Sequence, residues 1–316
     1  MDAMKDQDDV KRLVGGLKGL GNVLVALAAS VSEISDSLRR VASTDDEVGT
    51  LNQFGDKQLL ADVMADKVIR ETLLQLCPDD VGIVSSEETP VDTVLTDATG
   101  YSVAYDPLDG SSIIGSNFAV GSIFGIWKGR GFVGKNARDM AAAAYAVYGP
   151  RTVLVLAFED DSEDSGKTVC EFTLVGDGVW KCTEKNIVLK DEKKLFAPAN
   201  LRASKENSAY AELMQHWMQE QYTLRYTGGM VPDIHNIIHK GGGVFCNPIS
   251  ASCPAKLRLL YECHPFTYII EAAGGMSIDD TGAAGDRRIQ HHDDRSCICL
   301  GSTSEVKKCT PCMSSC

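Results

Sequence analysis

Apolar residues recur at alternating spacings of three and four between residues 10 and 41, which is the pattern of an amphipathic helix. Four glycines between residues 15 and 21 weaken its first half, so we expect a secure helix to begin near Asn22. A coiled-coil or partner-helix role stays open, but packing on its own domain is the simpler interpretation. A second helical pattern covers residues 57–76, with Asp56 placed to cap it.

Shorter apolar runs beyond residue 80 predict a series of strands. These are residues 81–85, 101–105, 118–127, 152–158, 244–246, 257–261 and 296–300, with a hairpin at 169–182. Helices are predicted at residues 139–147, 207–221, 232–239 and 265–273, and a last helix is expected to begin with a capping box of Ser302 and Glu305. Since strands and helices mix in both halves of the chain, the pattern predicts a layered α/β architecture. The charged stretch 184–194 is the best internal boundary, and it divides an N-terminal subdomain, residues 1–185, from a C-terminal one, residues 186–316.

The composition is ordinary for a soluble globular protein and argues against several classes of function. The chain has 316 residues, 44% hydrophobic and 24% charged, and no uninterrupted apolar run reaches about 18 residues, so a membrane partner is not indicated. The net charge of -13 argues against a nucleic-acid partner, although an acidic protein can bind an anionic substrate through divalent cations. The 11 scattered cysteines indicate reduced thiols, and the first nine residues lack the features of a signal or transit peptide, so we expect a cytoplasmic location.

The most informative segment follows a predicted strand and reads Asp106-Pro107-Leu108-Asp109-Gly110-Ser111-Ser112. Pro107 directs the chain out of the strand, so two carboxylates three residues apart can converge at its end. Gly110 and the two serines expose backbone N–H groups, which suit a phosphate. Carboxylates and carbonyls without nearby Cys or His suit hard cations, Mg²⁺ or Mn²⁺, rather than zinc. The alternative is an acidic surface turn, because turns favour the same residues.

Acidic residues at the ends of other predicted elements favour a metal site over a turn. Glu87 and Glu88 follow an apolar strand, and Glu262 ends an apolar run just before a helix. Asp62 lies on the buried stripe of its helix, where a carboxylate is costly unless something pairs with it. Asp66, one turn later, is the rival candidate. Several carboxylates from separate elements therefore predict a multi-metal site in a cleft.

Five segments resemble a known enzyme family. Residues 84–88, 106–112 and 257–262 resemble the metal and phosphate motifs of the fructose-1,6-bisphosphatase family, and residues 196–203 and 222–233 look like its sedoheptulose-bisphosphatase branch. The resemblance extends from about residue 52 to residue 305. Inositol-monophosphatase-like enzymes share a shorter Asp-Pro-x-Asp-Gly motif but not the C-terminal segments.

The resemblance implies a sugar-phosphatase fold, layered α-β-α-β-α with two mixed sheets, and a homo-oligomer, either a dimer or a tetramer. The implied activity is Mg²⁺-dependent hydrolysis of the 1-phosphate of sedoheptulose 1,7-bisphosphate, with fructose 1,6-bisphosphate as a second substrate. A preference for fructose bisphosphate or an inositol phosphate is one alternative. A non-catalytic metabolite-binding relative is another, and it predicts lost carboxylates, of which none is lost here.

The resemblance also assigns roles to individual residues. Two or three Mg²⁺ ions, or Mn²⁺ in their place, would be held by Glu87, Asp106, Asp109, Glu262 and the carbonyl of Leu108, with Asp56 and Glu87 serving a further ion. The attacking water would be positioned and deprotonated by Asp62 and Glu88. The transferred phosphoryl group would be held by Gly110, Ser111, Ser112 and Arg258, and the sugar by Lys256 and Met230. The distal phosphate would contact Asn200, Tyr226 and Arg202, with Arg225 reaching across from a neighbouring subunit.

Two positions depart from the fructose-specific pattern of the family. Fructose-specific relatives carry a tyrosine where this chain has Asn247, and another where it has Ala203. Smaller side chains at these positions would leave room for a longer sugar.

Two other pairs of residues have metal-binding chemistry but little support in the sequence. Cys309 and Cys312 form a lone Cys-x-x-Cys pair near the end of the chain, for which we expect no metal or redox role. His235 and His239 are one turn apart without a partnering ligand, so we interpret them as packing or surface residues.

Overall fold

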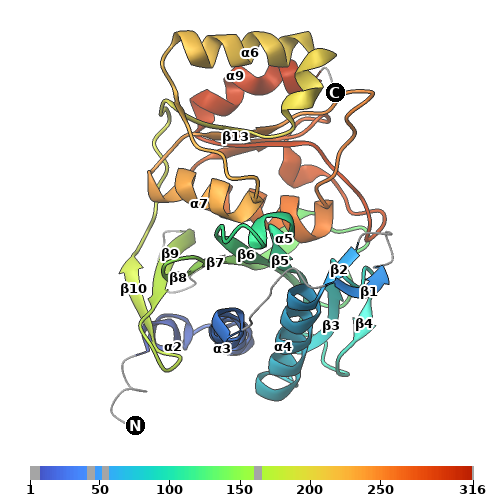
Figure 1. The fold of residues 1–316 in the computed structure, drawn as a ribbon. Helices are drawn as coiled ribbons and strands as arrows, with labels where there is room; N and C mark the ends of the chain where they lie inside the picture. Colours follow the sequence, from blue (N-terminus) through green and yellow to red (C-terminus); the bar gives the residue numbers. More distant parts are fainter. Residues whose placement is uncertain (1–7, 41–46, 52–56, 160–165, 315–316) are drawn as a thin grey trace.

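A computed structural model of the chain describes residues 8–40, 47–51, 57–159 and 166–314 (Figure 1). In these ranges three layers of helices alternate with two β-sheets, so the predicted α-β-α-β-α layering with two mixed sheets is confirmed. A small separate pair, β1 (Glu47–Leu51) and β2 (Lys57–Leu59), lies beside the larger sheet. Among the described helices, none combines the length and the apolar character that crossing a bilayer requires.

The larger sheet joins eight described strands in the order β10-β9-β8-β7-β6-β5-β3-β4. Their bounds are β3 (Val81–Ser86), β4 (Thr93–Val94), β5 (Tyr101–Asp109), β6 (Val120–Lys128), β7 (Met140–Tyr148), β8 (Thr152–Glu159), β9 (Lys167–Leu174) and β10 (Trp180–Glu184). From β5 to β10 each strand pairs antiparallel with the next, whereas β3 and β5 are parallel. The carboxyl ends of β3 and β5 therefore lie side by side.

The smaller sheet joins five described strands in the order β12-β11-β13-β15-β14. Their bounds are β11 (Leu195–Pro198), β12 (Thr223–Leu224), β13 (Val244–Asn247), β14 (Met276–Ile278) and β15 (Ile298–Gly301). β11 is parallel to β12 and β13, and β15 is antiparallel to β13 and β14. The chain changes from one sheet to the other between Glu184 and Leu195, and the division into two subdomains at residue 185 stays a prediction.

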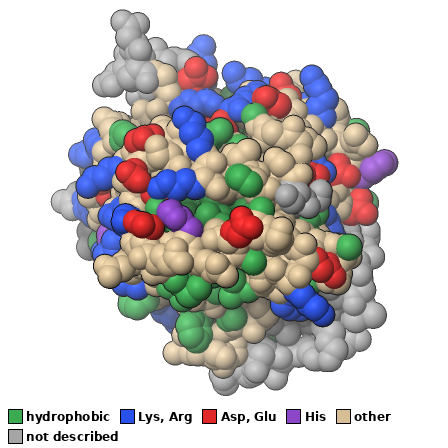
Figure 2. Space-filling view, turned by 90° about the horizontal axis from the view of Figure 1, so that it is seen from above, with side chains coloured by type: hydrophobic (Ala, Val, Ile, Leu, Met, Phe, Trp, Pro, Cys, Tyr) green, Lys and Arg blue, Asp and Glu red, His purple; other side chains and the backbone are tan. Residues whose placement is uncertain are grey.

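The helices form one layer between the sheets and one on each outer side (Figure 1). The larger sheet is covered by α2 (Asp9–Val14), α3 (Lys18–Arg40) and α4 (Leu60–Leu76), and the smaller sheet by α6 (Ser208–Gln219) and α9 (Thr303–Ser314). The middle layer contains α7 (Met230–His239) and α8 (His264–Ala272). Buried apolar side chains fall into three clusters, one beneath the first helices, one between the sheets and one beneath α6 and α9. On the face that carries α6, acidic and basic side chains are interspersed (Figure 2).

The first helices begin earlier than expected, because their glycines serve close packing. The carboxylate of Asp8 accepts the N–H of Val10 at 3.0 Å and caps α2. A Cβ atom added at Gly21 would clash with the carbonyl oxygen of Val14, so this glycine lets α3 pass close to the end of α2. The expected helix start near Asn22 is therefore wrong.

Residues 139–147, predicted as a helix, are almost entirely contained in the strand β7. Alanine has the highest helix propensity, and this segment is rich in it. In the structure, however, Tyr145 and Val147 face the core between the sheets, and Ala144 and Ala146 face the core beneath the first helices. A strand buried on both faces shows no alternation of polar and apolar residues. Packing overrides propensity here, and the helix prediction is wrong.

Residues 257–261, predicted as a strand, do not form one. A single π-helical turn, Leu259–Cys263, runs directly into α8. The N–H groups of Glu262 and Cys263 both donate to the carbonyl of Arg258 at 3.1 Å. Short apolar runs do not distinguish strand from helix, and in this case the helical turn places Glu262 just before α8.

Candidate active site

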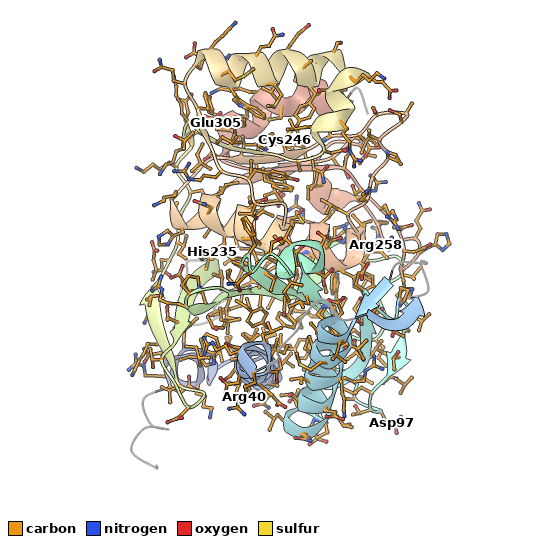
Figure 3. All side chains as sticks on the ribbon, viewed as in Figure 1. Arg40, Asp97, His235, Cys246, Arg258 and Glu305 are labelled. Carbon is orange, nitrogen blue, oxygen red and sulfur yellow. The ribbon has the colours of Figure 1, made fainter. Side chains whose placement is uncertain are left out.

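Six carboxylates from separate elements line one cavity of about 270 Å³. They are Asp62, Glu87, Glu88, Asp106, Asp109 and Glu262. The cavity lies where the ends of β3 and β5 meet the first turn of α4 and the turn before α8. Figure 3 shows Arg258, which also lines the cavity, at the level between the two sheets. The fold therefore brings acidic residues that are far apart in sequence to one place.

The end of β5 turns both aspartates of the motif toward the cavity. Residues three apart in a regular strand face opposite sides. Asp106 pairs with Ile123 and Asp109 with Gly121, so β5 contains one more residue than β6 across this interval. Such a bulge re-aims the side chains that follow it. The carboxylate of Asp106 also accepts the N–H of Leu108 at 3.0 Å, which holds the bulged segment in place.

The carboxylate of Asp109 lies at the N-terminus of α7. It accepts the N–H of Val231 at 2.7 Å and that of Met230 at 3.3 Å, two groups that have no partner within the helix. Burial raises the pKa of Asp109 to about 6, and these two hydrogen bonds oppose the rise. Asp109 thus joins the larger sheet to the middle layer of helices.

The carboxylates destabilise one another's charged forms. Burial raises the pKa of Asp106 well above its usual range, and the charge of Asp109 adds to this effect. Burial also raises the pKa of Glu262 to about 8, which the N–H of Arg258 opposes and the charge of Asp109 reinforces. One oxygen each from Asp106, Asp109 and Glu262 lie within 4.8 Å of one another. A cation among them would relieve the repulsion, and an all-oxygen donor set fits Mg²⁺ or Mn²⁺.

Glu87 and Glu88 follow β3 on the other side of the cavity. The Nε of Arg258 donates to Glu87 at 3.2 Å, so this carboxylate is partly neutralised. The backbone N–H of Glu88 donates to the hydroxyl of Ser86 at 3.2 Å, which orders the turn after the strand. Both glutamates are half-buried and keep access to the cavity.

Asp62 and its rival Asp66 have different surroundings. Asp62 is 4% exposed and lines the cavity. The carboxylate of Asp66 instead accepts the hydroxyl of Tyr105 at 3.1 Å and the guanidinium of Arg70 at 3.0 Å. Asp62 therefore faces the cavity, whereas Asp66 is engaged by Tyr105 and Arg70. Asp56, expected to serve a further ion, lies outside the described residues.

Backbone and cationic groups complete the cavity. Gly110 has a φ of 86°, a left-handed conformation that favours glycine, and it precedes the short helix α5 (Ser111–Ile114). Gly110, Ser111 and Leu108 line the cavity, as do Lys256 and Arg258. Ser112, the second serine of the motif, is exposed and is not among the lining residues.

A second, smaller cavity of about 90 Å³ adjoins the first and shares Asp109 and Leu257 with it. Tyr226, Met230 and Asn247 line it, so three of the residues expected at the sugar end are brought together. Ala203 is fully buried in the cluster beneath α6 and lines neither cavity, so its small size adds no room for a sugar.

Three residues expected at the distal phosphate do not reach either cavity. The amide of Asn200 donates to the carbonyls of Pro248 and Cys253, at 2.8 and 3.3 Å. Arg202 and Arg225 are exposed, and a guanidinium nitrogen of Arg225 donates to the carbonyl of Leu224 at 2.8 Å.

Two charged residues of these cavities were missed by the sequence analysis. Arg295 lines the larger cavity, because it forms an isolated β-bridge with Arg258. Asp233 lines the smaller one, and its carboxylate accepts the N–H groups of Thr227 and Gly228 at 2.7 and 3.3 Å. An acidic residue in the first turn of a predicted helix was a usable signal for Asp233, whereas no local pattern marks Arg295.

Comparison with known families and proteins gives consistent matches over nearly the whole chain. Residues 3–185 match the family described as "Fructose-1-6-bisphosphatase, N-terminal domain", and residues 189–314 match its C-terminal domain. The chain is 41% identical to the chloroplastic sedoheptulose-1,7-bisphosphatase of Spinacia oleracea, over 92% of this chain and 73% of the relative. It is 35% identical to the class 1 fructose-1,6-bisphosphatase of Geobacter sulfurreducens, over 96% and 94% of the two chains.

Two solved structures have the same fold. A crystal structure described as a sedoheptulose-1,7 bisphosphatase from Toxoplasma gondii matches with a TM-score of 0.87 and 35% identity, covering 98% of both chains. The holo form of Leishmania major fructose-1,6-bisphosphatase matches with a TM-score of 0.86 and 28% identity, covering 96% of this chain and 97% of the other.

Proposed function

Because the chain belongs to the fructose-1,6-bisphosphatase family and is a sugar-bisphosphate phosphatase, we propose that it hydrolyses the 1-phosphate of sedoheptulose 1,7-bisphosphate. Fructose 1,6-bisphosphate is the proposed second substrate. The choice of sugar is supported mainly by Asn247, whose small side chain lines the cavity next to the carboxylates. The 41% identity to a sedoheptulose-1,7-bisphosphatase, against 35% to a fructose-1,6-bisphosphatase, supports the same choice.

Enzymes of this family depend on metal ions, and we propose Mg²⁺, at two or three ions per site, with Mn²⁺ able to replace it. The proposed ligands are Glu87, Asp106, Asp109, Glu262 and the carbonyl of Leu108, with Asp56 and Glu87 for a further ion. When bound, the ions would polarise the phosphate and stabilise the departing sugar oxygen. The crowding of Asp106, Asp109 and Glu262, whose protonation is favoured by burial and mutual repulsion, supports this ligand set.

The chain's own groups would then act on water and phosphate. Asp62 and Glu88 are proposed to orient the attacking water, and a carboxylate oxygen of one of them to accept its proton. Gly110 and Ser111 would hold the phosphoryl oxygens through backbone N–H groups. The positive charges of Arg258 and Arg295 line the same cavity and would offset the negative charge of the phosphoryl group during transfer.

The sugar end is proposed to lie in the smaller cavity. Lys256 at the larger cavity and Met230 at the smaller one would contact the sugar, and Tyr226 would approach the distal phosphate. Arg202 is exposed close enough to Tyr226 to lower its pKa, against the larger effect of burial, so it can supply charge at this end. Asn200 would need to exchange its bond to the carbonyl of Pro248 for one to the phosphate.

Phosphate release from the two bisphosphates at fixed Mg²⁺ tests this function. We expect a higher kcat/KM for sedoheptulose 1,7-bisphosphate, with sedoheptulose 7-phosphate as the product. A higher value for fructose 1,6-bisphosphate would make the chain a fructose bisphosphatase, and release from the 7-position would overturn the proposed orientation.

The assembly and location remain predictions. We propose a dimer or tetramer in which the exposed Arg225 reaches the distal phosphate of a neighbouring subunit. Sedimentation of the wild type, and mixing of Arg225→Ala chains with active-site variants, would test it. The cytoplasmic location expected from the sequence stays a prediction that cell fractionation can check.

A further inference from the structure

Four cysteines meet beneath α9. Cys246 on β13 is paired across the ladder with Cys299 on β15, and Cys309 and Cys312 lie one turn apart on α9. All four are 0–1% exposed. Figure 3 shows Cys246 at the level of the smaller sheet, beneath α9. The Cys-x-x-Cys pair that stands alone in the sequence thus acquires two further sulfur atoms in the fold.

Three of the sulfur atoms lie close enough to share a single metal ion, and the fourth lies beside one of them. The Sγ atoms of Cys246, Cys299 and Cys309 lie within 4.8 Å of one another. That of Cys312 is outside this group but lies 3.8 Å from that of Cys246, so it would have to move toward the other two to complete a tetrahedron. A disulfide bond would bring two sulfur atoms to about 2.05 Å. Four thiolates at about 2.3 Å from Zn²⁺ stand about 3.8 Å apart along the edges of a tetrahedron. An iron–sulfur cluster needs wider spacing, because several iron atoms lie between its thiolates.

The thiols of the cluster do not titrate alike. Burial raises the pKa of the Cys246 and Cys299 thiols well above the usual range, whereas hydrogen bonds from these two thiols lower that of Cys309 to about 6 against the effect of burial. Zn²⁺ would therefore have to displace protons from buried thiols when it binds.

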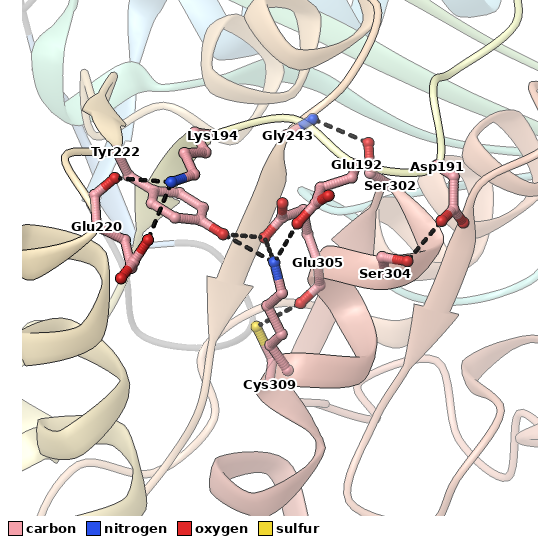
Figure 4. Close-up of polar contacts among 11 residues, drawn as sticks. Asp191, Glu192, Lys194, Glu220, Tyr222, Gly243, Ser302, Ser304, Glu305 and Cys309 are labelled. Atoms are coloured by element: carbon pink, nitrogen blue, oxygen red, sulfur yellow. Dashed lines mark hydrogen bonds and ion pairs between the residues drawn. The ribbon is translucent and has the colours of Figure 1, made fainter.

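The start of α9 is held by polar bonds to neighbouring segments (Figure 4), and near its end the amide of Asn207 donates to the carbonyl of Cys312 at 2.8 Å. Ser302 accepts the N–H of Gly243 at 3.1 Å, and Glu305 accepts the hydroxyl of Tyr222 at 2.9 Å, so these two residues bind neighbouring segments instead of forming the expected capping box. Further along, Pro311 removes one backbone N–H from the helix between the two cysteines. A cross-link through the thiols would add to these contacts.

We propose that Cys246, Cys299, Cys309 and Cys312 bind one Zn²⁺ ion in a tetrahedral site closed to solvent, which fastens α9 to β13 and β15. Binding replaces four S–H bonds by four Zn–S bonds and releases the thiol protons to the solvent. A closed site of four thiolates is typical of structural zinc. The site is separate from the carboxylate cavity and does not depend on the proposed substrate.

Metal analysis of the full chain tests this site. After expression with added Zn²⁺ and gel filtration in EDTA, we expect one zinc per wild-type chain, because chelators reach a closed site slowly. Cys309→Ser and Cys312→Ser should each lose this zinc, and Cys77→Ser, which changes a buried cysteine outside the cluster, should retain it. Wild-type protein without zinc, or zinc retained by both variants, would overturn the proposal.

A measurement on the wild type covers the case in which the variants fail to fold. Titration with an organomercurial should release the zinc as the four thiols react, and Co²⁺ in its place should show thiolate-to-cobalt charge-transfer bands. Release unrelated to thiol modification, together with a cobalt spectrum of oxygen and nitrogen ligands, would contradict a site of four cysteines.

A separate group of residues at the C-terminal end of α7 has the composition of a second metal site. Glu171 on β9 is 4% exposed, and its Oε2 accepts no hydrogen bond within the described residues. Its other oxygen accepts the hydroxyl of Thr183 at 2.9 Å. One ligand atom each from Glu171, His235 and His239 lie within 4.8 Å of one another, so the fold supplies the partner that the two histidines lack in the sequence. Oε2 of Glu171 lies 3.9 Å from Nδ1 of His239, beyond hydrogen-bond distance, and a cation bound between the two would compensate for its burial.

The donor set and its supporting contacts fit zinc. Nδ1 of His235 lies 3.0 Å from the hydroxyl of Tyr145, and a histidine that binds a metal through one ring nitrogen donates from the other to such a partner. His239 is exposed, which leaves an open position toward solvent. We infer that Glu171, His235 and His239 bind one Zn²⁺, tying the larger sheet to the helix whose first N–H groups hold Asp109.

Zinc titration against a chromophoric chelator tests this second site. Metal-depleted wild type should bind one more Zn²⁺ per chain than His239→Ala, whereas His216→Ala, an exposed histidine on α6, should match the wild type. Equal stoichiometry in wild type and His239→Ala would overturn the site. Since His239 is exposed, its loss should leave the fold unchanged, which circular dichroism can verify.

Discussion

The carboxylate cavity and the cysteine cluster both collect ionisable side chains from neighbouring strands and a helix, but they differ in chemistry and access. Asp106, Asp109 and Glu262 offer oxygen atoms, are 8–9% exposed and open to a cavity of about 270 Å³. The cysteines offer sulfur atoms and are 0–1% exposed. Hard oxygen donors suit Mg²⁺, and soft thiolates suit Zn²⁺. The difference teaches that donor type selects the ion, whereas access decides whether a substrate can share it.

The largest expected effect is at the carboxylate cavity. Asp109→Asn removes a proposed ligand charge, although an amide of the same shape can still accept the N–H of Val231. We expect kcat/KM for phosphate release to fall about 10³-fold or more, because weaker binding of the metal ion would remove its positive charge from the phosphate. The steady-state rate at saturating Mg²⁺ measures it.

The matched control is Asp177→Asn, an exposed aspartate in the turn before β10, with a φ of 47° that asparagine tolerates. It should keep wild-type activity. If Asp109→Asn were as active as this control, the cavity would not be the reaction site.

Glu88→Gln separates water activation from metal binding. The amide cannot accept the proton of the attacking water, so we expect kcat to fall about 10²- to 10⁴-fold. The Mg²⁺ concentration for half-maximal activity should stay near that of the wild type, since Glu88 is not a proposed ligand. A large rise in that concentration with an unchanged kcat would make Glu88 a ligand instead.

Asn247→Tyr tests whether the smaller cavity determines the preference between the two sugars, because it changes that cavity alone. A tyrosine would occupy most of the 90 Å³ of this cavity. Binding of the longer sugar should therefore weaken more than binding of fructose 1,6-bisphosphate. We expect kcat/KM for sedoheptulose 1,7-bisphosphate to fall about 10-fold relative to that for fructose 1,6-bisphosphate. An unchanged ratio would remove Asn247 as a determinant of specificity.

The smallest expected effect is on stability as a function of pH. Burial raises the pKa of Asp109 to about 6 and that of Glu262 to about 8, above the unfolded value of about 4. In metal-free protein these groups therefore favour folding fully below pH about 4, and this contribution is lost as the pH rises through about 6 and about 8. Added Mg²⁺ should restore this contribution, so the rise in Tm on adding Mg²⁺ should grow from pH 6 to pH 8.

Thermal unfolding with Mg²⁺ or with EDTA at each pH measures this increment. Both samples are prepared from protein already depleted of metal, so that zinc at the two proposed sites does not enter the difference. An increment that shrinks as the pH rises would contradict the sign derived from the carboxylates.

Local sequence predicted much of the carboxylate cavity, because its residues are marked by their immediate neighbours. Pro107 and Gly110 flank the aspartates, and the predicted strand before Glu87 is present as β3. The bulge that turns Asp106 and Asp109 to one side could not be predicted, since it depends on pairing with β6. Arg295 was missed for a similar reason, because its place comes from a bridge to Arg258.

The fold class was predictable and its details less so. The alternation of helices and strands indicated the layers, but the alanines of β7 carry no sign that the strand is buried on both faces. The clustering of the four cysteines could not be predicted from the sequence either. Cys246, Cys299 and the pair on α9 are individually ordinary buried residues, and they acquire a common chemistry when β13, β15 and α9 pack together.

The most direct test of the central claim is a crystal grown with Mn²⁺ and a sugar phosphate and measured at the manganese absorption edge. We expect anomalous peaks within coordination distance, about 2.0–2.3 Å, of oxygen atoms of Asp106, Asp109, Glu262 and Glu87, with a phosphate oxygen on the same ions. Manganese bound elsewhere, or a phosphate seated away from these carboxylates, would contradict the account.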